Sequence, residues 1–144
     1  MNDLSDNYNP DTVANTRIPY HSDHSNHNNL VFEENLLKEN EVKEFPEDLR
    51  KFLLNFSYKE VCIIKGILLK AKKSFNNSLL NESYLLEDIA EELISMLKRF
   101  KAYTINKGFK VIEKQDYLMR CTINEFQEHH AEENRRKNLE NFTL

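Results

Sequence analysis

Residues 82–107, ESYLLEDIAEELISMLKRFKAYTINK, decide the fold of this chain. Their apolar side chains recur every three or four positions for nearly seven turns, which is the period of an amphipathic helix. Acidic side chains gather at the front of the stretch and basic ones at its back, as the helix dipole favours. Gly108 follows and can take the left-handed conformation that ends many helices. The stretch therefore predicts one long helix from about Glu82 to Lys107.

Further helices are predicted before this stretch. Pro46 suits a first helical turn, and the residues from Leu49 to Phe56 then place apolar side chains on one face. Ser57 and Glu60 match the capping-box spacing, in which each side chain bonds a free amide at a helix start. A helix is therefore predicted from about Tyr58 to Phe75.

Two features are predicted after the long helix. Phe109–Ile112 is short, apolar and β-favouring, and a short third helix should follow from Glu113 to Phe126.

Only two glycines and three prolines occur in 144 residues, too few for the turns of an all-β sandwich or barrel. The predicted class is all-α, with a three-helix core and a long central helix.

The composition divides the chain into three parts. Residues 1–44 are acidic and poor in apolar side chains, so we expect a disordered N-terminal tail. Residues 45–126 form the predicted helical domain, and residues 127–144 a charged C-terminal tail or helix extension. The charge follows a similar division: residues 1–57 carry 5 basic and 11 acidic side chains, and residues 58–120 carry 12 basic and 8 acidic ones.

The order of these helices resembles the histone fold over Tyr58 to Phe126. The resemblance is carried by GFKVIEKQDYLM at 108–119, a glycine loop with a Val-Ile pair and an acidic residue before the third helix. LLEDI at 85–89 is similar to the start of the long helix in small subunits of TFIID, of the thirteenth TBP-associated factor type. A longer first helix and a second loop about two residues longer depart from that pattern, which leaves kinetochore histone-fold proteins open.

The resemblance implies a nuclear, non-catalytic subunit that heterodimerises with a second histone-fold protein in a larger transcription complex. Physical reasoning points the same way, because two short helices cannot cover all the apolar surface of a long one. The alternative is that residues 45–56 or the tail fold back and close a monomeric helical bundle, as in an adaptor or regulatory protein. The predicted partner-binding residues are Leu86, Ile89, Leu93, Leu97, Phe100, Tyr103, Val111 and Leu118.

Two lysine groups are candidates for contacts with DNA phosphates. In a paired histone fold, the first loop of one chain lies beside the second loop of the other. Such a platform would bind DNA without sequence preference, and it would suit the kinetochore or chromatin alternative. The alternative is an ordinary solvated surface. The lysines are Lys70, Lys72 and Lys73 near the first loop, and Lys107, Lys110 and Lys114 around the second.

The sequence favours no catalytic, metal or cofactor site, and we expect neither enzymatic activity nor a small-molecule substrate. The histidines lie in the predicted tails, where no rigid setting holds a catalytic base. His21, His24 and His27 have a spacing that could collect a metal ion weakly, although most such clusters in Asn- and Ser-rich segments are compositional. Cys62 and Cys121 are expected to be buried thiols, and Lys38-Glu39-Asn40 matches the KEN degradation motif. No apolar run approaches the roughly 18 residues of a membrane span.

Overall fold

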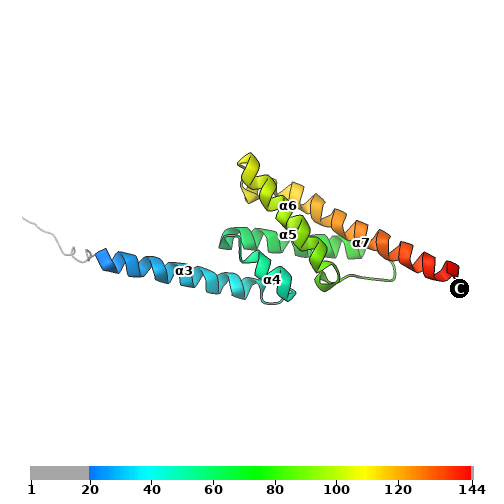
Figure 1. Ribbon diagram of the computed structural model, residues 1–144, viewed down its shortest axis with the longest axis horizontal. Coiled ribbons are helices and arrows are strands. Elements are labelled where there is room, and N and C mark those ends of the chain that lie inside the picture. The colour runs from blue at the N-terminus through cyan, green and yellow to red at the C-terminus, as the bar shows by residue number, and fades with distance from the viewer. Residues whose placement is uncertain (1–19, 144) are drawn as a thin grey trace, which may run out of the picture. The chain divides into compact units, whose positions relative to one another are not determined.

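The computed structural model describes the backbone of residues 20–143 and the side chains of residues 29–141 (Figure 1). Every regular element in this part of the chain is a helix, which confirms the predicted all-α class. The α-helices are α3 (Tyr20–Val42), α4 (Glu47–Leu53), α5 (Tyr58–Asn77), α6 (Ala90–Lys107) and α7 (Gln115–Thr143), and the 3-10 helices are η1 (Leu86–Ile89) and η2 (Val111–Lys114).

The chain divides into two units, Met1–Leu36 and Leu37–Leu144. The described part of the first unit consists of residues 20–36 of α3, whose exposed apolar side chains include Leu30 and Phe32. The helix at 20–42 differs from the disordered tail that we expected through residue 44. The packed second unit also begins earlier than residue 45, because Val42 is fully buried in its core.

The last turn of α3 is held by contacts within the second unit. The Lys38 ammonium donates to the carbonyl oxygens of Leu54 and Phe56, each at 3.0 Å. Glu41 pairs with Lys65 of α5 at 3.1 Å. The Lys38 bonds satisfy backbone carbonyls just beyond α4, and the pair of Glu41 with Lys65 joins the end of α3 to α5.

Helix α5 begins as the sequence predicts. The Ser57 hydroxyl accepts from the backbone N–H of Glu60 at 3.3 Å, and the Glu60 carboxylate accepts from the N–H of Ser57 at 3.0 Å. Both halves of the capping box are therefore formed, and two amides that no helical carbonyl reaches are satisfied.

The predicted long helix is divided into two elements. Leu85 is extended, and its N–H donates to the Asp88 carboxylate at 2.7 Å, which starts the 3-10 turn η1. Ile89 then departs from helical geometry, with φ −127° and ψ 25°, so the 18 residues of α6 begin only at Ala90. The end at Gly108 is as predicted, with φ 72°.

The segment after Gly108 corrects two further predictions. Residues 111–114 form η2 instead of a β-like segment, because Glu113 accepts from the N–H of Lys110 at 2.8 Å and closes a tight turn. Helix α7 follows with 29 residues and is the longest of the described α-helices. The predicted order of a long middle helix and a short last one is therefore reversed.

The core lies among α4, α5, α6 and α7 (Figure 1). Helix α7 packs along α5, and α6 packs against both α4 and α7. Leu49 and Leu53 of α4 are fully buried. At the other end of the bundle, Phe126 of α7 stacks on Phe75 of α5 with ring centroids 5.7 Å apart. The short helix and the long last helix thus supply apolar surface that we had expected from a partner.

Candidate functional site

The residues predicted to bind a partner lie mostly in the core of this one chain. Seven of the eight are buried, and only Tyr103 is half-exposed, which corrects the expectation of an exposed stripe. The reason is internal closure by α4 and α7, the alternative that the sequence had left open. The seven are Leu86, Ile89, Leu93, Leu97, Phe100, Val111 and Leu118.

A groove with a volume of about 510 Å³ opens on a different surface of the second unit. Its walls come from the end of α3, from α5 and from η1. Leu69 and Leu85 stand in it with 37% and 57% of their surface exposed, while Phe45 and Leu86 beneath them are buried. The lining residues are Asn40, Glu41, Lys43, Glu44, Phe45, Lys65, Leu69, Lys72, Leu85, Leu86 and Glu87. We call this set the leucine groove.

The leucine groove is built by helical spacing and carries balanced charge. Lys65, Leu69 and Lys72 follow one another at intervals of four and three, so they share one face of α5. Three lysines and three glutamates line the groove, and the pair between Glu41 and Lys65 bridges α3 and α5 at 3.1 Å. The site thus combines exposed leucines with both signs of charge.

The two lysine groups lie at opposite ends of the bundle. Lys70, Lys72 and Lys73 lie near the end of α5, whereas Lys107, Lys110 and Lys114 surround the turn from α6 to α7. Phe75, near the end of α5, stacks on Phe126 of α7. Phe126 lies twelve positions after Lys114 in the sequence. Twelve helical residues span about 18 Å, so the six lysines do not form one surface in a single chain.

The second lysine group is accompanied by an aromatic cluster that sequence reasoning missed. The ring of Tyr103 lies 4.9 Å from that of Tyr117 and 5.8 Å from that of Phe109. The Lys114 ammonium lies 4.0 Å from the centre of the Phe109 ring. Tyr103 and Phe109 are six residues apart and meet only because the chain reverses at Gly108.

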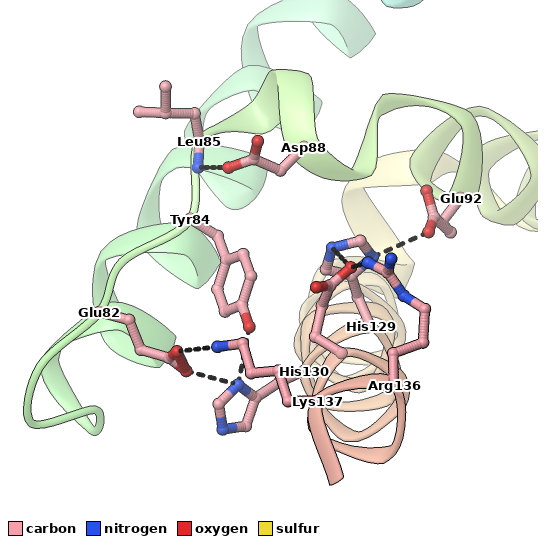
Figure 2. Close-up of polar contacts among 10 residues, drawn as sticks. Glu82, Tyr84, Leu85, Asp88, Glu92, His129, His130, Arg136 and Lys137 are labelled. Atoms are coloured by element: carbon pink, nitrogen blue, oxygen red, sulfur yellow. Dashed lines mark hydrogen bonds and ion pairs between the residues drawn. The ribbon is translucent and has the colours of Figure 1, made fainter. Parts of the chain in front are cut away.

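Figure 2 shows a polar cluster around His129 and His130 of α7. His130 Nδ1 lies 2.8 Å from the Tyr84 hydroxyl and 3.1 Å from the Glu82 carboxylate. His129 Nδ1 lies 3.0 Å from the carboxylate of Glu92 on α6. The sequence placed both histidines in a tail without a rigid setting, and the structure corrects this, because both are half-buried.

This cluster connects the segment before η1 to α7. Lys137 pairs with Glu82 at 3.3 Å, and Asn76 of α5 bonds the backbone of Tyr84 in both directions, at 2.8 and 2.9 Å. Burial raises the pKa of Tyr84, and the nearby Glu82 carboxylate raises it further. The phenol therefore stays neutral at physiological pH and can serve as a hydrogen-bond partner of His130.

A signal for this cluster was present in the sequence. Phe126, His130 and Glu133 continue the three- and four-residue spacing of the apolar positions before them. A helix that ended at Phe126 would have left that spacing unexplained. The histidines were missed because a polar composition was taken to mean that α7 had nothing more to bury.

Three other features had been singled out in the sequence: a histidine spacing, a match to the KEN motif and two cysteines. The side chains of His21, His24 and His27 lie outside the described residues. Lys38-Glu39-Asn40 is helical, with Lys38 bonded to two carbonyls. Cys62 and Cys121 are free thiols, but both are half-buried.

Among the described residues no group of three or more potential ligands is arranged to hold a metal ion. No described helix is long and apolar enough to cross a membrane.

Neither a protein-family model nor a curated protein matches this chain. The resemblance to the histone fold accordingly stays a prediction.

Proposed function

We propose that this protein is a non-enzymatic helical adaptor that binds a partner protein in the leucine groove. The observation that carries the proposal is the pair Leu69 and Leu85, which are exposed in one groove that buried apolar residues also line. Burying a leucine side chain contributes about 1.5–3 kcal/mol, so the two can anchor an interface although each is already partly covered.

The proposed occupant is one amphipathic helix of the partner. A helix presents apolar side chains at intervals of three and four, and such a pair would fit between Leu69 of α5 and Leu85 before η1. The lining carries lysines and glutamates in equal number, so the partner helix should flank its apolar residues with both signs of charge. A uniformly acidic or basic partner would meet as much repulsion as attraction.

The polar cluster supports the non-enzymatic part of the proposal. His130 contacts Tyr84 and Glu82, and His129 contacts Glu92, so these groups serve to join α7 to α6 and to the segment before η1. A general base must reach a substrate proton with a defined geometry, and both half-buried histidines already make structural contacts.

The proposal is tested by the size of the native complex. The tagged full-length chain is expressed in cells, and its elution is compared with that of the purified 17.2-kDa protein. We expect the cellular protein to elute as a larger complex, and Leu69→Asp with Leu85→Asp to return it to the monomer position. Leu80→Asp is the matched control, because Leu80 is 97% exposed and lies outside the groove. Elution as a monomer without any substitution, or equal loss in the control, would contradict the proposal.

A second candidate is pairing with another histone-fold protein in a nuclear transcription complex. It rests on the resemblance of the sequence to the histone fold. The placement of the two lysine groups at opposite ends suits the kinetochore or chromatin alternative, because head-to-tail pairing would bring one group of each chain together. This candidate requires α4 and α7 to expose the predicted pairing residues, since seven of these eight are buried within the single chain. Light scattering and circular dichroism on the full chain distinguish the two: a folded monomer with a cooperative melt favours the adaptor, and a self-dimer or poorly folded chain favours pairing.

A further inference from the structure

We propose that the end of the bundle at the α6–α7 turn binds single-stranded nucleic acid. The surface consists of Tyr103, Lys107, Phe109, Lys110, Lys114 and Tyr117, and we call it the aromatic–lysine surface. It is distinct from the leucine groove, with which it shares no residue. The two proposals therefore stand or fall separately.

The aromatic rings are partly open to solvent. Phe109 is 38% exposed and Tyr117 is 36% exposed. Both rings contact Tyr103, at 5.8 and 4.9 Å between centroids, so the three form one continuous aromatic patch. Tyr117 also stacks on the buried ring of Phe100, so Phe109 supplies the exposed face on which an unpaired base can stack, whatever its sequence.

Positive charge surrounds these rings. Residues 103–120 carry Lys107, Lys110, Lys114 and Arg120 against Glu113 and Asp116, which leaves a net charge of +2 in a chain whose total is −4. The Glu113 carboxylate is also occupied by the backbone N–H of Lys110 at 2.8 Å, and so faces the turn. The local field therefore favours a phosphate backbone beside the aromatic patch.

Lys114 connects the two parts of the surface. Its ammonium lies 4.0 Å from the centre of the Phe109 ring and 5.9 Å from that of Tyr103. Lys114 is half-buried, and a cation–π contact that is not fully desolvated is weak, so the ammonium can move to a phosphate while a base takes its place on the ring. The same side chain would then contribute to both phosphate contact and access to the stacking face.

These features favour a single strand over the other polyanions. In a duplex the base faces are already stacked on one another, so the exposed rings would gain nothing from them. An acidic peptide would pair with the lysines, but it carries no flat aromatic ring beside each negative charge that could stack on the exposed rings. Stacking and phosphate contact together are the combination that single-strand-binding proteins use. DNA and RNA share this chemistry.

The test is fluorescence anisotropy with the full chain and labelled oligothymidylate or oligouridylate, which distinguish DNA from RNA. Phe109→Leu keeps apolar volume and removes the ring, and we expect the affinity to fall about 5-fold to 100-fold. Lys110→Gln should weaken binding and reduce the slope of log affinity against log salt by about 0.7. Lys70→Gln with Lys73→Gln is the control at the opposite end of the bundle, and it removes two positive charges where Lys110→Gln removes one.

Three outcomes would overturn the inference. The first is no binding to either oligonucleotide at low salt. The second is an equal loss in the Lys70 and Lys73 control, which would indicate only general charge attraction. The third is tighter binding to a duplex of the same length, or to a polyglutamate peptide. Circular dichroism melts of each variant separate these results from a loss of fold, and Tyr117→Leu provides a second ring deletion if Phe109→Leu is unstable.

Discussion

Replacing Leu53 with alanine tests whether α4 closes the core of this chain. Leu53 is fully buried, and α4 packs on α6 (Figure 1). The substitution removes three carbon atoms, which lowers the free energy of unfolding by about 2.4 kcal/mol at about 0.8 kcal/mol per buried methylene. The cavity left behind raises the total to about 3–5 kcal/mol. Because single domains are stable by only about 5–15 kcal/mol, this loss is a large share of the total.

The measurement is urea unfolding of the full chain, followed by circular dichroism. Leu80→Ala is the matched control, and its free energy of unfolding should stay within about 0.5 kcal/mol of the original, because Leu80 is 97% exposed. A loss below about 1 kcal/mol for Leu53→Ala would refute the reasoning. It would mean that α4 contributes little to the core and that the face of α6 beneath it is available to a partner.

Three further substitutions follow from local geometry. Ser57→Ala removes the hydroxyl that accepts from Glu60, and urea unfolding should show a loss of about 1 kcal/mol. Gly108→Ala meets no neighbouring atom, so its expected loss of about 1 kcal/mol, measured the same way, comes only from φ 72°. Burial raises the pKa of Glu125, although Arg99 pairs with it at 3.2 Å. The native state therefore holds this proton more tightly than the unfolded state, and stability falls as pH rises from about 4.3 through the raised pKa. Glu125→Gln should be stabilising in urea unfolding near neutral pH but not in acid, and a variant less stable at both would contradict this.

The helix boundaries set by local chemistry could be predicted from the sequence. Ser57 and Glu60 are three residues apart and complete each other's bonds without help from distant residues. Gly108 ends α6 because its missing side chain allows a positive φ. In both cases the decisive interactions lie within one turn of the residue, so the pattern and the structure agree.

The division of residues 86–107 could not be predicted in the same way. The apolar spacing continues through Ile89, but Asp88 caps the N–H of Leu85 and so starts a separate 3-10 turn. Periodicity identifies which side chains face the core, and both a continuous helix and a turn followed by a helix satisfy it. The capping bond that decides between them comes from Asp88, and an acidic residue is equally favourable in the first turn of a longer helix.

The larger error concerned the surfaces that cover the apolar side chains of α6. Leu93 and Leu97 were correctly identified as residues that must be covered, yet the covering elements are α4 and α7 of the same chain. An amphipathic pattern states that a face is buried and does not state against what. Residues 127–144 were left open as a tail or a helix extension for a related reason. What holds α7 there is two histidines, which contact Glu82, Tyr84 and Glu92 and also lie edge-on to the rings of Phe75 and Tyr84.

The candidate sites differ in how far the sequence reveals them. Lys110 and Lys114 were recognisable as a basic group, but the rings beside them became one patch only through the reversal at Gly108. Leu69 and Leu85 both belonged to apolar patterns, and nothing in those patterns marked them as the members left exposed. Exposure within an apolar stripe depends on the packing of neighbouring helices, which is information from the whole fold.

The leucine groove and the closure of the core depend on the same short segment of chain. Asn40, Glu41 and residues 43–45 line the groove, while Val42 and Phe45 of the same segment are buried in the core just before α4. A partner that binds the groove would therefore hold the segment that positions α4, and it would stabilise the native state by mass action, by about 2.7 kcal/mol at a hundred times its dissociation constant. Conversely, loosening α4 would disturb the wall of the groove. Partner binding and core stability are thus thermodynamically linked in this chain, and a substitution such as Leu53→Ala should weaken partner binding although Leu53 does not line the groove.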